Sequence, residues 1–392
     1  MFSFLTAPQF ANNRALLAAI SCAAVCGIVF GLSMPLISLR LEHMTGSGLV
    51  VGLNGAALAL STLAIAPLVP RLMALAPARI LLIGVLIAAA ALFALFPLMP
   101  AVTPWFILRF AVGCFITVVF VISETWINQI VTPQRRAFML GVYGTALAGG
   151  FGIGGLMFAA FSTAGDLPFY LASGVFLLGI GPVALLNSPQ AVAPAREDAS
   201  MDAIIDAAKS APAAILAGLA FGAIETLTFS MLPVYADRIS LDPVSIGMMV
   251  LAVAMGVLVF QIPLGWIADR TGRRVTLLAI AAIATLGPVL IGLAGTSLGL
   301  LIPILFIQSG VASGLYTVGL SLLGERFTGG RIAAANAAFI FAYGLGSLLS
   351  PPAAGVAMDG FGPSGLLVVL AITAGAYLLF LALTHRKAAR RS

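Results

Sequence analysis

Two long apolar runs meet at the charged segment Pro263-Leu-Gly-Trp-Ile-Ala-Asp-Arg-Thr-Gly-Arg-Arg274. The runs cover residues 245–267 and 275–294, and each is long enough to cross a bilayer as a helix. Between them, four charged residues occupy six positions: Asp269, Arg270, Arg273 and Arg274. Such a cluster is too costly to place in hydrocarbon. The segment therefore predicts a short turn at one face of a membrane.

The composition of the whole chain supports a membrane protein. Hydrophobic residues make up 61% of the chain and charged residues only 8%, whereas soluble domains are about 45–50% apolar. We find no interleaved aromatic and basic pattern that would indicate nucleic-acid binding, and no metal-ligand spacing. A phosphate-binding Gly-x-x-x-x-Gly-Lys-Ser/Thr loop is also absent from the sequence. We therefore expect no cofactor, no metal and no enzymatic activity.

Twelve apolar stretches predict an all-α protein with twelve transmembrane helices. They lie near residues 15–38, 48–69, 79–98, 103–130, 137–161, 167–186, 212–236, 245–267, 275–294, 298–324, 331–357 and 364–384. The polar segment 187–211 reads as a linker with a short surface helix around 201–209. This predicts an N-terminal six-helix bundle over 1–186 and a C-terminal bundle over 212–392 with a short basic tail.

Internal similarity favours a duplication of six helices. Pro35-Leu-Ile-Ser-Leu-Arg40 in the first helix resembles Pro233-Val-Tyr-Ala-Asp-Arg238 in the seventh, and Pro67-Leu68 resembles Pro263-Leu264 at nearly the same shift. Two pseudo-symmetric six-helix bundles are therefore expected.

The basic residues predict the orientation in the membrane. All but three of the 19 Lys and Arg residues lie at the termini or in the loops that follow even-numbered helices. The three exceptions are Arg40, Arg109 and Arg238. By the positive-inside rule, both termini and the linker are expected in the cytoplasm.

The charged turn also resembles a known motif. The pattern Gly265-x-x-x-Asp269-Arg270-x-Gly272-Arg273-Arg274 is similar to the cytoplasmic loop motif of the major facilitator superfamily, the twelve-helix secondary transporters. Gly265 would let a neighbouring backbone come close, and Gly272 would permit the turn. Asp269 is expected to pair with Arg273 near the cytoplasmic ends of helices ten and eleven. The equivalent first-half loop, 69–79, lacks the acidic residue and the glycine.

Small residues in helices five and eleven predict close helix packing. Gly150-x-x-x-Gly154 puts two glycines on one face of the fifth helix. The eleventh is rich in glycine and is expected to be broken by Pro351-Pro352. The family resemblance implies that both helices lie at the contact between the halves.

Four polar residues within predicted helices are the candidates for a substrate cavity: Arg109, Glu124, Glu225 and Gln308. A charge at the centre of a membrane helix costs about 2.5–3.5 kcal/mol on insertion scales, so each needs a reason. The four lie on helices four, seven and ten, which line the central cavity in the family that the chain resembles. Glu225 and Glu124 are the candidates for proton coupling, with Arg109 as the charge that tunes them or binds an anionic substrate group.

Structural roles compete with these assignments. Glu124 could pair with Arg71 or Arg79 at the membrane face, and Glu225 could form a buried pair with Arg109 that fixes helix packing. A membrane-embedded enzyme, a channel and a non-transporting structural protein are the rival classes. An enzyme would need a nucleophile–base pair or metal ligands within the helices, and no histidine is placed to serve. A channel or a structural protein would not explain the charges on helices four, seven and ten or the loop motif.

The sequence thus predicts a secondary active transporter that works by alternating access, with proton-coupled efflux (antiport) of a small organic molecule as the leading interpretation. Proton-coupled uptake (symport) of a sugar, organic acid or other metabolite, or uncoupled facilitation, are the alternatives. The expected partners are a small-molecule substrate, protons and the lipid bilayer, without nucleic acid, for a monomer that spans the bacterial cytoplasmic (inner) membrane many times.

Overall fold

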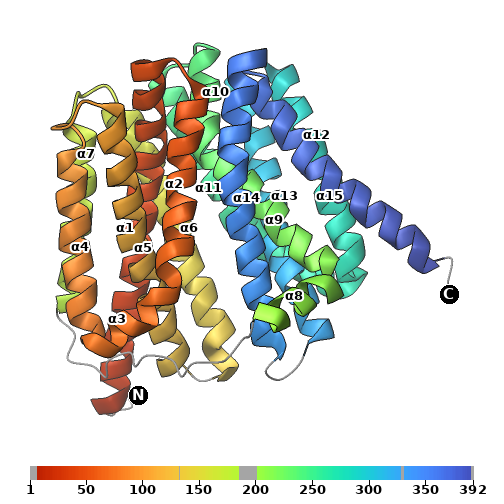
Figure 1. Ribbon diagram of the computed structural model, residues 1–392, viewed down its shortest axis with the longest axis horizontal. Helices are drawn as coiled ribbons and strands as arrows, with labels where there is room; N and C mark the ends of the chain where they lie inside the picture. Colours follow the sequence, from red (N-terminus) through yellow and green to blue (C-terminus); the bar gives the residue numbers. More distant parts are fainter. Residues whose placement is uncertain (1–6, 132, 185–200, 328–330, 390–392) are drawn as a thin grey trace, which may run out of the picture. The chain divides into compact units, whose positions relative to one another are not determined.

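The computed structural model describes residues 7–131, 133–184, 201–327 and 331–389. These residues form helices and short connections, and no strand occurs among them (Figure 1). Twelve helical segments of this described part are long and apolar enough to cross a membrane. The predicted all-α architecture with twelve membrane-spanning helices is therefore confirmed.

The first half of the chain forms seven α-helices and one 3-10 turn: α1 (Ala7–Thr45), α2 (Gly48–Ile65), η1 (Ala66–Leu68), α3 (Val69–Leu75), α4 (Ala78–Leu95), α5 (Val102–Ile130), α6 (Pro133–Phe161) and α7 (Leu167–Ala184). The second half forms α8 (Met201–Ser210), α9 (Pro212–Thr226), the π-helical turn η2 (Leu227–Met231), α10 (Leu232–Arg238), α11 (Pro243–Thr271), α12 (Arg273–Ala294), α13 (Leu298–Arg326), α14 (Arg331–Phe361) and α15 (Gly365–Ala389). The predicted surface helix around 201–209 is α8 and is confirmed.

Two local predictions were wrong. The first-half loop 69–79 contains a helix, α3, because Pro67 and Pro70 occupy the first turns of η1 and α3, where a missing N–H costs nothing. The eleventh span is not broken at Pro351-Pro352, since α14 continues through both residues. Neighbouring helices can satisfy the backbone groups that a proline frees inside a membrane protein.

Local sequence signals define the ends of α11. Asp242 is its N-cap, and one carboxylate oxygen accepts the N–H groups of Val244 and Ser245 at 2.9 and 3.0 Å. These bonds, led by one from the Ser245 hydroxyl, lower the pKa of Asp242. At the other end Gly272 has φ 90°, a conformation open to glycine, and it joins α11 to α12. The predicted glycine turn is confirmed.

The chain divides into two compact units, and each is described by itself. Unit one comprises residues 1–36 and 60–195, and unit two comprises residues 37–59 and 196–392. The end of α1 and the first part of α2 therefore group with the C-terminal helices. The division into bundles 1–186 and 212–392 stays a prediction based on the repeat.

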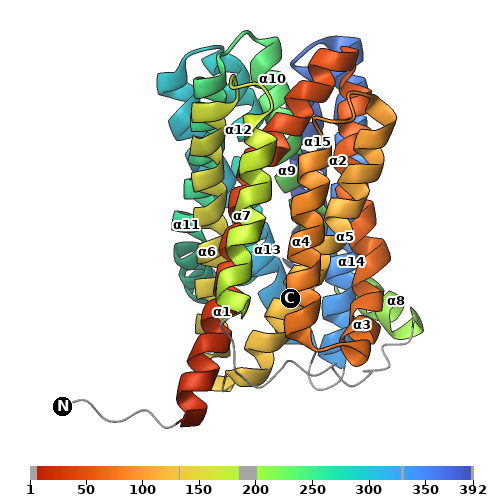
Figure 2. The same ribbon diagram turned by 90° about the vertical axis from the view of Figure 1, so that its left-hand side faces the viewer.

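In unit one, α4 packs beside α7 and α5 (Figure 2). Aromatic rings fill the contact: Phe96 lies between Trp105 and Phe169, with centroid distances of 5.2 and 5.6 Å. These rings are almost fully buried, and burying such large apolar side chains stabilises the helix packing.

The glycines of α6 serve close packing within unit one. A Cβ atom at Gly150 or Gly154 would overlap the backbone of α1 at Ala24 and Ile28, respectively. Small residues let two membrane helices approach at the backbone, which compensates for the weak hydrophobic drive between helices in lipid. The predicted packing role of Gly150-x-x-x-Gly154 is therefore confirmed.

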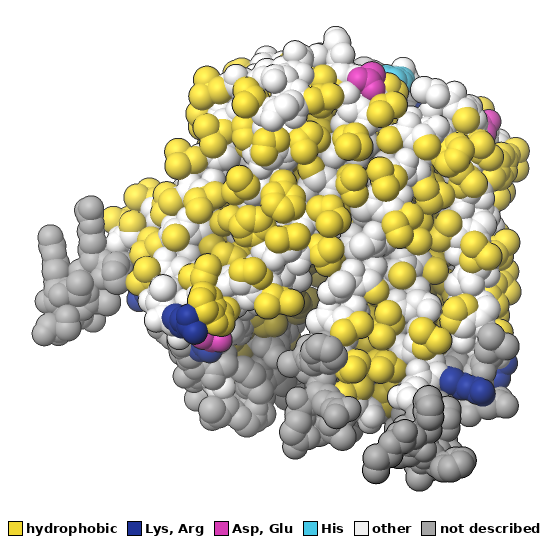
Figure 3. All heavy atoms as spheres, turned by 180° about the vertical axis from the view of Figure 1, so that it is seen from behind, with side chains coloured by type: hydrophobic (Ala, Val, Ile, Leu, Met, Phe, Trp, Pro, Cys, Tyr) yellow, Lys and Arg dark blue, Asp and Glu magenta, His cyan; other side chains and the backbone are white. Residues whose placement is uncertain are grey.

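In unit two, α9 packs against α13 and α14, while α12 packs against α13 and α15. A cluster around the fully buried Phe339 joins α9, α13 and α14. Large apolar side chains also remain exposed, including Ile262 and Leu293 at 81% and 77%. Figure 3 shows such side chains spread over one face of the molecule. A surface of this kind suits lipid as the solvent.

Candidate functional site

Glu225 lies at the centre of the seventh membrane span, Pro212–Arg238, which α9, η2 and α10 form together. Directly after it, the helix changes to the π turn Leu227–Met231. The Ser230 hydroxyl donates to the carbonyl of Thr226 at 2.6 Å and satisfies one backbone group of this irregular turn. π turns inside α-helices occur frequently at functional sites.

The Glu225 carboxylate accepts a hydrogen bond of 2.6 Å from the hydroxyl of Tyr343 on α14. The Glu225 side chain is half-buried. Phe221, one helical turn earlier on α9, contacts the Tyr343 ring at a centroid distance of 5.9 Å. Sequence reasoning missed Tyr343, since a tyrosine in a glycine-rich helix gives no signal of its partner. The pairing of Glu225 with Arg109, which belongs to unit one, stays a prediction.

The fourth span, α5, carries both Arg109 and Glu124 in unit one. Arg109 is 2% exposed, and its Nε has no hydrogen-bond partner among the described residues. Glu124 is exposed, and no ion pair of the described residues joins it to Arg71 or Arg79. The Arg79 guanidinium donates instead to the carbonyl of Ala184. The interfacial pairing considered for Glu124 is therefore absent from this structure.

Gln308 lies on α13 and is 5% exposed. A Cβ atom at Gly287 of α12 would overlap its side chain, so the amide packs against α12. Its Oε1 has no hydrogen-bond partner in the described part of the chain. A buried amide with an unmade bond is costly, and its predicted role in substrate binding remains to be tested.

The motif turn has the predicted ion pair. Asp269 near the end of α11 and Arg273 at the start of α12 are 3.8 Å apart across the turn, and Asp269 is 71% exposed. Arg270 lies over the Trp266 ring, 3.6 Å from its centroid. The expected close approach at Gly265 was wrong, because a Cβ there would meet no described atom within 4 Å. An exposed pair of this kind is worth about 0–1 kcal/mol.

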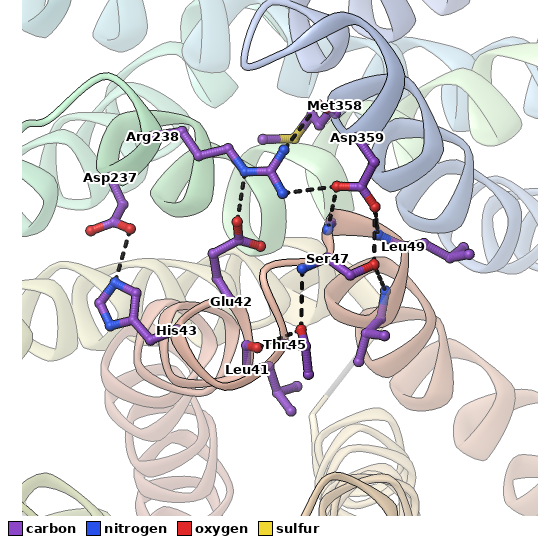
Figure 4. A network of polar contacts seen from close by, with 12 residues as sticks. Leu41, Glu42, His43, Thr45, Ser47, Leu49, Asp237, Arg238, Met358 and Asp359 are labelled. Atoms are coloured by element: carbon purple, nitrogen blue, oxygen red, sulfur yellow. Dashed lines mark hydrogen bonds and ion pairs between the residues drawn. The ribbon is translucent and has the colours of Figure 1, made fainter.

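A second polar site, which we call the Arg238 cluster, lies entirely within unit two (Figure 4). It comprises Glu42 and His43 of α1, Asp237 and Arg238 of α10, and Asp359 of α14. Arg238 donates to Glu42 at 2.7 Å, to Asp359 at 2.9 Å and to the carbonyl of Met358 at 2.9 Å. His43 contacts Asp237 at 2.9 Å. One guanidinium fork thus joins α1, α10 and α14.

Asp359 also caps the start of α2. Its carboxylate accepts the N–H groups of Gly48 and Leu49 at 2.7 and 3.0 Å, where the helix dipole favours a negative charge. Next to this cap, the backbones of α2 and α14 are in direct contact. A Cβ at Gly52 would overlap the carbonyl of Pro351, and one at Gly355 would overlap the carbonyl of Gly48. The first turns of α2 are therefore tightly attached to α14.

Sequence reasoning noted Arg238 as part of the internal repeat and as an exception to the basic-residue pattern, without a partner. The signal that could have found the cluster was the opposite charge at matching helix ends: Glu42, Asp237 and Asp359 all lie within the last turns of spans one, seven and eleven. Charges at the same membrane face can meet, even when 121 or 196 residues separate them.

Comparison with known proteins assigns the family. The model of the Major Facilitator Superfamily matches residues 19–257 and 211–392, which together cover nearly all of the chain. The chain belongs to the major facilitator superfamily. It is therefore a secondary transporter and not an enzyme.

Two curated relatives within this superfamily are bacterial transporters of uncharacterised function. The MFS-type transporter YfkF of Bacillus subtilis is 26% identical over 369 residues, which is 93% of this chain and 94% of the relative. YcaD of Salmonella dublin is 27% identical over 283 residues, 71% of each chain. Neither relative is described by a substrate.

Solved structures of superfamily members share the fold. The nucleoside transporter NupG aligns with a TM-score of 0.75 at 13% identity, covering 95% of this chain and 98% of that one. A bacterial homologue of the human lysosomal transporter Spinster, in an inward-facing and unoccupied conformation, aligns with a TM-score of 0.72 at 13% identity, covering 97% and 96%. At such identity the likeness establishes the fold alone.

Proposed function

We propose that this transporter exports a small organic molecule in exchange for protons, with Glu225 as the main proton carrier. The observation that supports this most strongly is the hydrogen bond from Tyr343 to a carboxylate at the centre of the seventh span, beside a π turn. A carboxyl group at this depth needs a partner or a proton to be tolerated. Among the described residues, the Tyr343 hydroxyl is the hydrogen-bond donor to the Glu225 carboxylate, and this donor carries no charge.

Proton coupling requires the carboxyl group to meet two environments. In one, the group is enclosed and holds its proton, and in the other it is hydrated or close to a cation and releases it. A π turn next to Glu225 provides a place where the seventh span can change its local geometry. Glu124 is the second candidate, because it is a carboxylate within the fourth span and has no ion-pair partner among the described residues.

Alternating access also requires a closure that can open, and the Arg238 cluster is suited to that role. It ties α2 and the end of α1 to α10 and α14 through charged hydrogen bonds. Arg238 lies at the membrane face that the basic-residue pattern assigns to the outside.

Efflux is favoured over uptake by the composition of the candidate helices. Sugar and polar-metabolite sites need many amide and indole donors, and the fourth, seventh and tenth spans contain few Asn, Gln and Trp residues. Their side chains are mostly apolar, which suits an amphipathic substrate. Symport of a metabolite and uncoupled facilitation are the outcomes that the following experiment distinguishes.

Purified protein in liposomes loaded with a pH-sensitive dye tests the proposal. After a panel of amphipathic organic compounds is screened for binding by thermal shift at two pH values, each binder is placed on one side of the membrane. We expect protons to move opposite to the substrate. Movement in the same direction would establish symport, and substrate flux without proton flux would establish facilitation.

The orientation gives a prediction for intact cells. Ser200 and Ser392 lie outside the described residues, and both are expected in the cytoplasm together with the linker and both termini. Cysteines introduced at these positions, in a variant without Cys22, Cys26 and Cys114, should react with a membrane-impermeant maleimide only after the cells are permeabilised. Ready labelling of either position in intact cells would contradict this orientation.

A substitution in the motif turn is expected to reduce transport only modestly. Asp269→Asn removes the pair with Arg273, which biases a conformational equilibrium without contacting substrate. Because the pair is exposed, we expect turnover to fall by about fivefold at most, with substrate affinity nearly unchanged. Asp206→Asn, on the exposed surface of α8, serves as the control. Weaker binding at unchanged turnover would argue against a conformational role.

A further inference from the structure

Three aromatic side chains from three helices meet beside Glu225. Phe221 lies one turn before it on α9, Tyr343 of α14 donates to its carboxylate, and Tyr316 reaches the group from α13. The ring centroids are 5.5 Å apart for Phe221 and Tyr316, 5.9 Å for Phe221 and Tyr343, and 6.3 Å for Tyr316 and Tyr343. A carboxylate and three π-faces thus share one small region of unit two.

A buried core lies on one side of these three aromatic rings. Tyr316 stacks edge-on against Phe339, which is fully buried, at a centroid distance of 5.4 Å. Glu225, Tyr316 and Tyr343 are themselves half-buried, and Phe221 is 9% exposed. The rings therefore form a wall with a buried core behind Tyr316, and Glu225, Tyr316 and Tyr343 each keep part of their surface exposed.

No protein cation neutralises Glu225 within the described part of unit two. The ion pairs found there use Glu42, Asp237, Asp359 and Asp269. The Lys and Arg residues of unit two that the structure describes all lie at or close to helix ends: Arg40, Lys209, Arg238, Arg270, Arg273, Arg274, Arg326, Arg331, Arg386 and Lys387. When Glu225 is ionised, a counter-charge for it has to come from outside the described part of unit two.

From this geometry we infer that the transported substrate is an amphipathic organic cation, an amine or quaternary ammonium on an apolar body, whose positive charge contacts Glu225 and the faces of Phe221, Tyr316 and Tyr343. Aromatic rings attract cations through their negative faces, by about 0.5–2 kcal/mol for each good contact. The apolar body lies on the same rings. The inference rests on the proposed antiport and names its substrate class.

The same carboxylate would then bind the proton and the cation in turn. The titratable groups that face Glu225 from the packed helices are the phenols of Tyr343 on α14 and Tyr316 on α13, while the α15 phenol, Tyr377, donates to the carbonyl of Ala213. Phenols ordinarily titrate near pH 10, so Glu225 is the group among these that changes charge at lower pH. Cation binding is therefore expected to weaken on acidification.

Two ions of nearly the same shape and opposite charge test the inference. Tetraphenylphosphonium and tetraphenylborate are titrated against the full-length protein in lipid nanodiscs, with empty nanodiscs as the blank. We expect the phosphonium to bind, with at least tenfold weaker affinity at pH 5.5 than at pH 8, and the borate not to bind specifically. Equal binding of both ions, or binding of neither, would overturn the inference.

Substitutions test whether the phosphonium binds at Glu225 and the three aromatic rings beside it. Glu225→Gln should weaken phosphonium binding by about tenfold or more, since the charge is lost. Tyr316→Leu should weaken it by about threefold to thirtyfold, the equivalent of one cation–π contact. Tyr343→Phe keeps the ring and should have the smallest effect. Melting temperature and gel filtration without ligand establish that each variant is folded. Unchanged phosphonium affinity in both Glu225→Gln and Tyr316→Leu would refute the assignment.

The outcomes separate the substrate class from the coupling mechanism. If a neutral or anionic compound is driven across by a pH gradient and the phosphonium is not bound, the antiport stands and the cation inference fails. If the phosphonium binds with unchanged affinity from pH 5.5 to 8, the competition at Glu225 fails, and with it the proposed coupling.

Discussion

Glu225→Gln is expected to abolish transport driven by a pH gradient while the protein stays folded. Glutamine has nearly the shape of a protonated glutamic acid, and its carbonyl oxygen can still accept the hydrogen bond from Tyr343. It cannot release a proton. The variant should therefore lose accumulation or extrusion of substrate against its gradient, to the level of empty liposomes. Exchange of labelled for unlabelled substrate at equal pH should persist where binding is still measurable.

Glu124→Gln is the matched control for this result. It removes the other carboxylate of the predicted set, in unit one, by the same chemical change. If Glu225 is the main carrier, Glu124→Gln should keep most of the gradient-driven transport. The reverse order of effects would make Glu124 the carrier, and full activity in both variants would show that neither carboxylate couples transport to protons.

Arg238→Met is expected to release the end of α1 from α10 and α14. The substitution keeps the apolar stem and removes the cation that joins Glu42 to Asp359, two carboxylates whose side chains are 9% and 30% exposed. Breaking a buried pair and leaving its charge uncompensated costs about 3–5 kcal/mol. This free energy corresponds to a change of about a hundredfold or more in the equilibrium constant between the closed and the open conformation, in favour of the open one.

Maleimide labelling measures that shift. Ala56 of α2 is 6% exposed. A cysteine placed there in a cysteine-free background should react at least tenfold faster after Arg238→Met, because the end of α1, which a short turn joins to α2, is then no longer held to α10 and α14. Transport should fall in parallel. Asp237→Asn is the control, since it breaks only the pair with the exposed His43 and should change labelling by little. An unchanged labelling rate in Arg238→Met would mean that the cluster does not hold the closure.

The membrane spans were predictable because hydropathy and length are properties of contiguous sequence. The same holds for the turn at Gly272, where the residue type itself carries the backbone preference. The ion pair of Asp269 with Arg273 was predicted from the charged loop motif, whose residues lie close together in the sequence. α3 was missed because Pro67 and Pro70 look like loop residues until their places in the first turns of η1 and α3 are known.

Contacts between distant segments were not predictable in the same way. The sequence indicated that Glu225 needs a partner, but nothing in it selects Tyr343, which lies 118 residues away. The Arg238 cluster joins three spans, and its partners are chosen by how the helix ends meet. The π turn was missed because hydrophobic periodicity over five residues does not distinguish it from an α-helix.

The π turn also sets the angular register of the seventh span. Because its bonding takes up one residue more than an α-turn, the residues after it are rotated by about 100° relative to an uninterrupted helix. Glu225 precedes the turn and Arg238 follows it. Deletion of one residue between Leu227 and Met231 would keep both Glu225 and Arg238 in the sequence. If Glu225 still faced Tyr343, however, Arg238 would be rotated away from Glu42. Substitutions can alter either site separately, whereas a change of length in these five positions alters both at once.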